Sequence, residues 1–205
     1  MSDRKQHWEQ VYTNKSALDV SWYQAEPRLS LELIQHSGLG KDAPLIDVGG
    51  GASLLVDRLQ AQGYRQLAVL DISATALAVA RQRLGDRAAV IEWYEADVTQ
   101  FNAPHPYSLW HDRAVFHFLT AAEDRQRYVE VLNRTLIPGG HVIIAAFAPG
   151  GPTLCSGLDI VQYDAAKLMA ELGPRFQLEE QQTETHRTPA GKEQLFGFFR
   201  LRKPG

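Results

Sequence analysis

Leu45-Ile-Asp-Val-Gly-Gly-Gly-Ala-Ser53 is the stretch of this chain that decides the fold. A short apolar run ends in an acidic residue, three glycines follow, and a helical pattern then begins. The run from Pro44 to Val48 predicts a buried parallel strand, because it is brief, apolar and bounded by turn-forming residues. The glycines allow a sharp turn and the close approach of a ligand, since no Cβ stands in the way. A helix that opens just after them presents free backbone N–H groups, so the stretch predicts a nucleotide-type binding loop.

Strand-like and helical patterns alternate along the rest of the chain. Expected strands cover residues 44–48, 66–70, 88–94, 107–110 and 141–147, and expected helices cover 52–62, 74–84, 122–136 and 165–172. Such alternation implies a parallel sheet with helices on both faces. Two more strand-like runs, 176–185 and 194–202, have only a turn between them, so they should pair antiparallel. The sequence therefore predicts an α/β fold with a doubly wound, mainly parallel seven-stranded sheet that ends in an antiparallel hairpin.

The bulk composition is that of an ordinary globular chain. Its 205 residues predict a single domain over 1–205, with a helical cap segment at 1–43 and a Rossmann-like core at 44–205. A net charge of −3 and scattered Lys and Arg residues argue against nucleic-acid or anionic-membrane partners. No run approaches the roughly 18 apolar residues of a membrane span, and the polar start lacks a signal-peptide pattern. With one cysteine, Cys155, a cytoplasmic location is expected, and the oligomeric state is left open.

Acidic residues end four successive expected strands: Asp47, Asp71, Asp97 and Asp112. In open α/β sheets this edge is where ligands bind. A carboxylate after the second strand is well placed to accept hydrogen bonds from ribose hydroxyls, and Asp97 can accept from an exocyclic amine such as that of adenine. The plainer alternative is that each aspartate only caps the helix that follows it. Four of them in successive units, after a glycine loop, favour the ligand site.

These residues resemble the class I S-adenosylmethionine-dependent methyltransferases, in their small stand-alone form, from about Lys41 to the C-terminus. The matching segments are Asp47-Val-Gly-Gly-Gly51, Leu70-Asp-Ile72, Glu95-Ala-Asp-Val98, Asp112 with the residues after it, and Leu136-Ile-Pro-Gly-Gly140. The resemblance implies the strand order 3-2-1-4-5-7-6 with the seventh strand antiparallel. It also implies S-adenosylmethionine as cofactor, with S-adenosylhomocysteine as product.

The resemblance further implies a role for each matching residue. Asp47, Gly49, Gly50 and Gly51 would line the methionine half of the cofactor, and Asp71 would hold the ribose hydroxyls. Ile72 would pack on adenine, Asp97 and Val98 would meet the adenine edge, and Asp112 would lie beside the sulfonium and the acceptor.

Aromatic residues mark the first 43 residues: Trp8, Tyr12, Trp22 and Tyr23. This pattern is similar to stand-alone members that include protein-lysine methyltransferases of the elongation-factor type, in which an aromatic lead helix folds over the cofactor. Trp22 and Tyr23 are therefore candidate cofactor contacts. The alternative is that these rings only pack a helix onto the sheet, and aromatic side chains can do both.

The segment after the fourth strand, Trp110-His-Asp-Arg-Ala-Val-Phe-His-Phe118, holds the candidate catalytic residues. With Asp112 these are His111 and His117 as proton acceptors and Arg113, which could anchor an acidic substrate or pair with Asp112. His117 lies among apolar residues, so a core histidine is the plainer reading of it. The histidines lack the spacing of a metal site, and no metal is expected.

Methyl transfer to a small molecule is the function that this pattern favours. A protein side chain such as lysine is the second acceptor class, in view of the N-terminal resemblance. A nicotinamide-dependent oxidoreductase is the alternative from another enzyme class, since Asp71 would also suit an NAD ribose. Against it, Leu54 stands where a dinucleotide fingerprint has its third glycine. A non-catalytic cofactor-binding protein is the remaining alternative.

Overall fold

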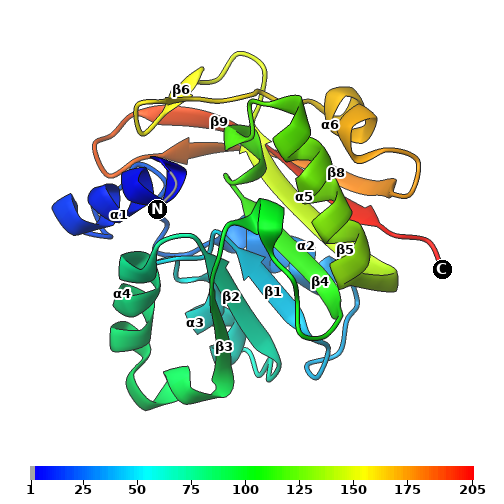
Figure 1. The fold of residues 1–205 in the computed structure, drawn as a ribbon, viewed down its shortest axis with the longest axis horizontal. Coiled ribbons are helices and arrows are strands. Elements are labelled where there is room, and N and C mark those ends of the chain that lie inside the picture. Colours follow the sequence, from blue (N-terminus) through cyan, green and yellow to red (C-terminus); the bar gives the residue numbers. More distant parts are fainter. Residues whose placement is uncertain (1–2) are drawn as a thin grey trace.

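The structure is a computed structural model that describes residues 3–205 (Figure 1). At its centre lies a seven-stranded sheet in the order β3-β2-β1-β4-β5-β9-β8. The strands are β1 (Leu45–Val48), β2 (Leu67–Asp71), β3 (Ile91–Glu95), β4 (Tyr107–Arg113), β5 (Leu136–Phe147), β8 (Gln177–Arg187) and β9 (Glu193–Arg202). The first five are parallel, whereas β9 is antiparallel to both β5 and β8. The predicted sheet, with its order 3-2-1-4-5-7-6 and closing hairpin, is confirmed.

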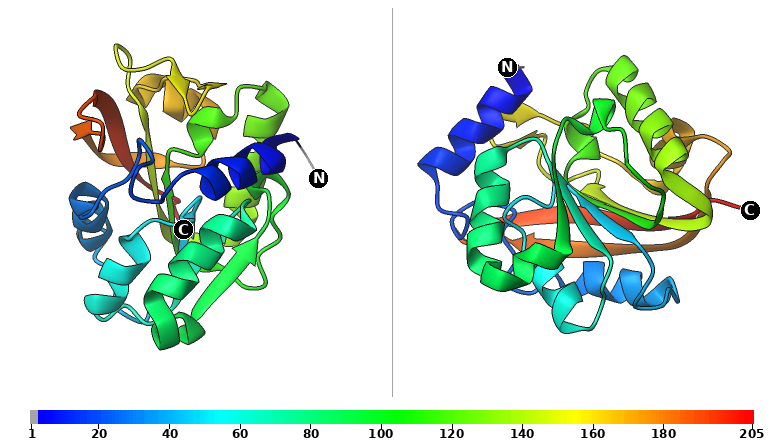
Figure 2. Two further views of the ribbon diagram at one scale, coloured as in Figure 1. Left: turned by 90° about the vertical axis from the view of Figure 1, so that its left-hand side faces the viewer. Right: turned by 60° about the horizontal axis from the view of Figure 1, so that its bottom comes forward.

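Helices cover both faces of the sheet, as the alternating pattern predicts (Figure 2). The helices α2 (Arg28–His36), α3 (Leu55–Ala61) and α4 (Ala74–Leu84) pack on one face, and α5 (Ala122–Thr135) and α6 (Ala165–Leu172) pack on the other. Short 3₁₀ turns lie at Gly85–Val90, Val98–Gln100 and Phe116–Phe118, and a small hairpin joins β6 (Leu154–Cys155) to β7 (Leu158–Asp159). The N-terminal helix α1 (Asp3–Asn14) lies across the end of α4, at the edge where the parallel strands end.

Side chains alternate between the two cores along each buried strand, because successive residues of a strand point to opposite faces. In β1, Ile46 and Val48 join the core under α5 and α6, while Leu45 joins the core under α2, α3 and α4. In β4, Trp110 belongs to the first core and Leu109 to the second. This alternation decides which way the polar residues at the strand ends face.

Several element boundaries differ from the sequence expectation. The helix expected from residue 52 begins at Leu55, because a turn bonds the Ser53 N–H to the Gly50 carbonyl and the Ser53 hydroxyl accepts from the Leu55 N–H. The fifth strand begins at Leu136 rather than at residue 141. Within the described part of the expected helical segment 1–43, residues 3–43, two helices are joined by an irregular stretch, residues 15–27.

Candidate functional site

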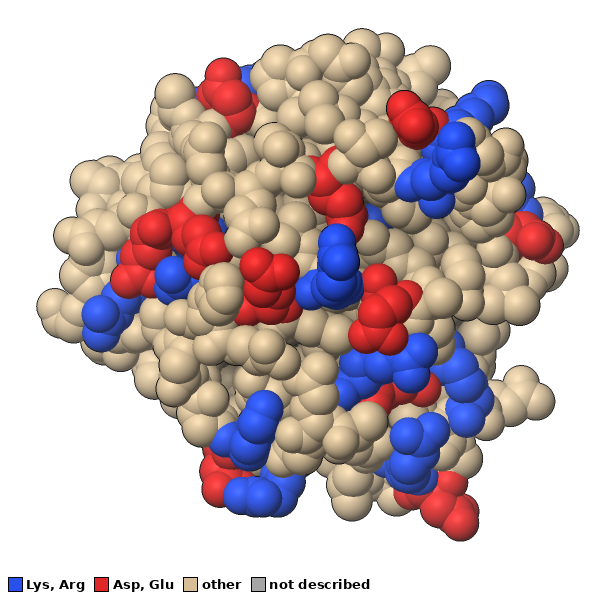
Figure 3. Space-filling view, turned by 180° about the vertical axis from the view of Figure 1, so that it is seen from behind, with Lys and Arg blue, Asp and Glu red and all other residues tan. Residues whose placement is uncertain are grey.

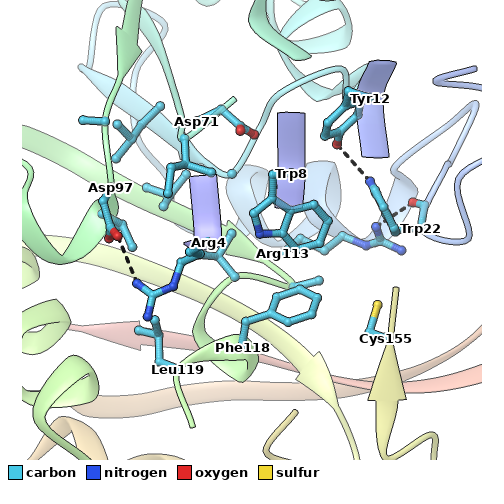
Figure 4. Close-up of a pocket in the computed structure, with 18 residues that line it drawn as sticks. Arg4, Trp8, Tyr12, Trp22, Asp71, Asp97, Arg113, Phe118, Leu119 and Cys155 are labelled. Carbon is cyan, nitrogen blue, oxygen red and sulfur yellow. Dashed lines mark hydrogen bonds and ion pairs between the residues drawn. The ribbon is translucent and has the colours of Figure 1, made fainter. Parts of the chain in front are cut away.

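A cavity that opens to solvent lies at the carboxyl ends of β1, β2 and β4, beneath α1 (Figure 4). In open α/β sheets this edge is where ligands bind. The lining residues come from seven segments of the chain: Arg4, Trp8, Tyr12, Trp22, Val48, Gly49, Leu70, Asp71, Ile72, Ala96, Asp97, Val98, Arg113, Ala114, Val115, Phe118, Leu119 and Cys155. Strand ends from across the sheet thus meet in one space, at the edge that the acidic residues predicted.

A second recess adjoins this cavity. Tyr12, Trp22, Gly49 and Arg113 line both spaces. The recess holds four more of the predicted site residues, Asp47, Gly50, Tyr23 and His111. The predicted residues are therefore divided between two neighbouring spaces, with Gly49 and Arg113 at their boundary.

The glycine loop is shaped by the side chains that surround it. Gly49 has φ +66° and a Cβ there would lie 2.0 Å from Val115 Cγ2, so both the backbone conformation and the space exclude other residues. A Cβ on Gly51 would lie 2.5 Å from Asp71 Oδ2. Gly51 lines neither space, and what it does is let the loop pack directly against the Asp71 carboxyl group.

Asp71 ends β2 with a nearly buried carboxyl group, and Oδ1 accepts a hydrogen bond of 2.8 Å from the Ser73 N–H. Burial, together with the negative charges of Asp47 and Glu9, raises the pKa of Asp71 to about 7 against the opposing effect of the backbone hydrogen bonds. Of the ion pairs recorded among residues 3–205, none includes Asp71. A ligand that donates hydrogen bonds to this carboxylate would stabilise its charged form.

Asp97 lies at the far end of the cavity, after β3. Oδ1 accepts from the Thr99 N–H at 2.9 Å, which makes Asp97 the N-cap of a short 3₁₀ turn. Oδ2 pairs with Arg4 Nη1 at 3.0 Å, and Arg4 Nη2 pairs with Asp124 at 2.6 Å. Arg4 thus ties α1 to the carboxylate that the sequence analysis assigned to an adenine edge. This geometry is compatible both with Asp97 as a helix cap and with Asp97 as a contact for the adenine edge.

Aromatic rings form the wall of the cavity that α1 contributes (Figure 4). Trp8 packs edge-on against Phe118 and Trp22, with ring centroids 5.0 Å and 5.6 Å apart. Trp22 Nε1 donates a hydrogen bond to the Tyr12 hydroxyl at 3.2 Å. The sequence analysis did not assign Arg4 or Phe118 to the site. The i, i+4, i+8 spacing of Arg4, Trp8 and Tyr12 is the signal that places all three on one face of a helix.

A buried hydrogen-bonded chain runs from β1 to α2 through His111. His111 Nδ1 lies 2.7 Å from Asp47 Oδ1, and Nε2 lies 2.9 Å from Ser30 Oγ. Because β1 and β4 pair with Asp47 opposite His111, the sheet register creates this contact. Both ring nitrogens have partners and the ring is only 2% exposed, so the geometry opposes the predicted role of His111 as a free proton acceptor.

The structure corrects the prediction for Asp112. Its side chain points to the opposite face of β4 from His111, is fully buried and lines neither space. Oδ2 accepts from the Tyr128 hydroxyl at 2.6 Å, and Oδ1 accepts from the Val115 N–H at 2.9 Å. Burial raises the pKa of Asp112 to about 6. Asp112 therefore holds the backbone after β4 and does not lie beside the cavity.

His117 is likewise a core residue rather than a proton acceptor at the site. It is fully buried, lines neither space and stacks against Phe118 and Phe147. Burial, with a smaller contribution from the Arg113 charge, lowers the pKa of His117 to about 3. The expectation that His117 is a core histidine agrees with these surroundings.

Arg113, the last residue of β4, turns back to the His111 face and lines both spaces. The expected pair with Asp112 does not form, because adjacent strand residues point apart. Arg113 Nη1 instead donates to the Trp22 carbonyl at 2.9 Å. The next residue, Ala114, has φ +71°, a strained conformation for a residue with a Cβ and one that clusters at functional sites.

The surface and the helices bear on the remaining expectations. On the face drawn in Figure 3, basic and acidic side chains are interspersed rather than gathered by sign. Within residues 3–205, no helix is both long and apolar enough to cross a bilayer. No group of His, Cys, Asp or Glu side chains in the same range has the arrangement of a metal site. Burial raises the pKa of the Cys155 thiol to about 11, so this lining residue is a weak nucleophile at neutral pH.

Comparison with known protein families gives one match, described as a methyltransferase domain, over residues 46–144. Nodulation protein S of Rhizobium tropici is 29% identical over 107 residues, which are 52% of this chain and 44% of that protein. The eEF1A lysine and N-terminal methyltransferase of Danio rerio is 25% identical over 146 residues, 69% of this chain and 21% of that protein. The chain thus spans less than half the length of these curated relatives.

Solved structures share the fold over nearly the whole chain. The N-methyltransferase NodS of Bradyrhizobium japonicum, in complex with S-adenosyl-L-homocysteine, superposes with a TM-score of 0.75 at 18% identity and full coverage of both chains. The 1,6-didemethyltoxoflavin-N1-methyltransferase of Burkholderia thailandensis gives 0.70 at 18% identity, over 98% of this chain and 84% of the other. Likeness at this level of identity establishes the fold.

Proposed function

We propose that this protein, which has the class I methyltransferase fold and carries a methyltransferase domain over residues 46–144, transfers a methyl group from S-adenosylmethionine to a small-molecule acceptor. The observation that carries the proposal is the meeting of Asp71, Gly49 and Asp97 around one cavity at the carboxyl edge of the parallel strands.

The residues of the cavity fit this cofactor. Asp71 has a buried carboxyl group with no ion pair among residues 3–205, and a pair of ribose hydroxyls would supply the donors that its charged form needs. Ile72 and Val98 offer apolar surface for a planar base, with Asp97 at its edge. Gly49 lines both spaces, so the amino-acid half of the molecule would lie against a residue that has no side chain.

The bound cofactor would supply an activated methyl group on a sulfonium. The protein's task is then to orient the acceptor in line and to exclude water. Trp8, Trp22 and Phe118 wall the cavity with apolar rings, which suits the exclusion of water. Both ring nitrogens of His111 are hydrogen-bonded, and the side chains of His117 and Asp112 are buried and line neither space. We therefore infer that the acceptor reaches the site already nucleophilic, as a neutral amine or an ionised oxygen or sulfur does.

A small-molecule acceptor is supported by the structural likeness to an enzyme named for a small-molecule N-methylation. A protein-lysine acceptor is the second candidate, since one curated relative is named a lysine and N-terminal methyltransferase. The interspersed surface charges support a function without nucleic acid, and the one unpaired cysteine supports a cytoplasmic location; both remain predictions.

The test is binding followed by turnover. Isothermal titration calorimetry should show binding of S-adenosylhomocysteine and none of NAD; the reverse result would point to the oxidoreductase. Methyl-labelled S-adenosylmethionine is then incubated with the protein and a cell extract separated into metabolite and protein fractions. We expect label in the metabolite fraction. Label in protein alone would identify the second candidate, and binding without any transfer would indicate a non-catalytic protein.

A further inference from the structure

Arg113 holds a charged side chain whose hydrogen bonds are only partly satisfied. Nη1 donates to the Trp22 carbonyl at 2.9 Å, whereas Nε and Nη2 are buried and have no hydrogen-bond partner among residues 3–205. The guanidinium carbon lies 4.8 Å from the centre of the Phe196 ring, so one face of the group is covered by an aromatic side chain. The edge that carries Nε and Nη2 is the part left without a partner.

No acidic side chain in the described part of the chain forms an ion pair with this guanidinium. Glu184, Cys155 and Asp47 act on it only through the electrostatic field, and none lies within ion-pair distance in the recorded bridges. Two histidines also face it. Burial and the Arg113 charge lower the pKa of His117 and of His186, which disfavours the charged form of both rings. Arg113 is thus a lone positive charge in a mostly buried setting.

Such a group is costly to keep in a protein without a partner. A buried donor that has lost water and found no acceptor destabilises the fold, and more so when it is charged. Proteins retain such groups where a ligand completes them. Arg113 lies on the boundary of the cavity and the recess, so a molecule bound in either space is a neighbour of its side chain.

The geometry of the free edge selects the chemistry of the partner. Nε–H and Nη2–H point the same way and are spaced to meet the two oxygens of one carboxylate in a bidentate pair. We propose that Nε and Nη2 of Arg113 bind a carboxylate, carried into the site by the acceptor or by the amino-acid end of the cofactor. This inference rests on the proposed function. If the acceptor is the source, the substrates of this protein are small organic acids that also bear the nucleophile.

The arms of the test distinguish the two sources. Calorimetry compares wild type with Arg113→Met, which keeps the apolar stem, and with Arg113→Lys, which keeps the charge but loses the paired donors. Arg134→Met is the matched control, because Arg134 also donates to a backbone carbonyl but lies outside both spaces. Circular dichroism checks that each variant folds, and Arg113→Lys alone suffices for the comparison if Arg113→Met does not.

The first arm titrates S-adenosylhomocysteine and 5′-methylthioadenosine, which lacks the amino-acid carboxylate. A cofactor source predicts that Arg113→Met weakens the former about tenfold or more and leaves the latter unchanged. The second arm titrates phenylacetate and the uncharged phenylacetamide into the S-adenosylhomocysteine complex. An acceptor source predicts a preference of wild type for phenylacetate of about tenfold or more, lost in both Arg113 variants and kept in Arg134→Met.

The proposal is overturned if wild type binds S-adenosylhomocysteine and the Arg113 variants match it in all four titrations. Wild type that binds no S-adenosylhomocysteine would instead refute the proposed function, and the two failures are therefore distinguishable.

Discussion

Asp71 is the single residue on which cofactor binding should depend most. Its carboxyl group lines the cavity and faces no cation within ion-pair distance in residues 3–205. We expect Asp71→Ala to weaken the binding of S-adenosylhomocysteine by about 1–3 kcal/mol, the effect of losing hydrogen bonds to a charged acceptor. Calorimetry at pH 8, above the raised pKa of Asp71, measures the loss. The exposed Asp159→Ala serves as control, and equal affinities for the two variants would remove the ribose role.

Tyr128 and Tyr163 form a matched pair of buried phenols that should lose stability to different extents when the hydroxyl is removed. Tyr128 donates to Asp112 at 2.6 Å and accepts from Trp110 at 2.8 Å, whereas the buried Tyr163 hydroxyl has no partner in the described chain. We expect Tyr128→Phe to lower the free energy of unfolding by about 1–3 kcal/mol, because two buried polar groups lose their partner. Tyr163→Phe should cost less than about 0.5 kcal/mol. Urea unfolding of both variants decides; similar losses would contradict this account of Asp112.

Among the elements, α1 contributes one wall of the cavity, and the rest of the fold does not determine where α1 lies. None of its residues is fully buried, so apolar packing alone does not hold it in place. Polar contacts attach it instead. Glu9 accepts from the N–H groups of Ala74 and Thr75 and from the Ser73 hydroxyl, at the N-terminus of α4. A carboxylate at that position is favoured by the helix dipole, and these bonds lower the pKa of Glu9.

Glu9→Gln should loosen α1 without unfolding the protein. The amide keeps the size of the side chain but removes the charge at the α4 N-terminus, which is worth about 0.3–1 kcal/mol at an exposed site. We expect hydrogen exchange of the α1 amides to accelerate by about two- to fivefold, with no change in β5. Glu130→Gln, an exposed site on α5, is the control. Unchanged exchange in α1 would mean that the aromatic contacts of Trp8 hold the helix by themselves.

For the whole molecule, the buried titratable groups set how stability depends on pH. Burial raises the pKa of Asp71 from its unfolded value of 3.8 to about 7 and that of Asp112 to about 6. Between pH 3.8 and these raised values, the folded state therefore binds more protons than the unfolded state. Both groups thus lower the free energy of unfolding as the pH rises through this range. His117 has the opposite sign, because its pKa falls from 6.5 to about 3 and stability is lost as pH drops below 6.5.

A comparison of wild type with Asp71→Asn isolates the contribution of Asp71 to the pH dependence of stability. The variant cannot ionise, so its stability relative to wild type should increase between pH 4 and pH 7.5 and then level off. Each unit of pKa shift corresponds to about 1.4 kcal/mol, and the total gain should be on the order of a few kcal/mol. Urea unfolding at pH 4, 6 and 8 measures it. A stability difference that does not change with pH would refute the raised pKa.

Much of the architecture is readable from local patterns. The apolar runs, the glycine bends and the acidic strand ends predict the alternating strands and helices, the hairpin and the cavity edge, because each is encoded within a few neighbouring residues. The strand order, by contrast, was implied by the family resemblance. The family resemblance placed Asp112 beside the sulfonium, whereas the structure turns its side chain to the opposite face of β4 from His111. Strand alternation is a local signal that separates the two side chains.

The tertiary structure alone decided what closes the cavity and what the polar strand ends contact. Arg4 reaches Asp97 across 93 positions and His111 reaches Asp47 across 64, and no local pattern specifies such partners. Sheet register and helix packing bring these groups together, since hydrogen bonds form between neighbours in space. The sequence alone was enough to predict a cofactor-binding edge of the sheet. Only the folded chain shows that Arg113 has no ion pair with an acidic side chain among residues 3–205. The absence of a partner depends on all the residues that surround a side chain.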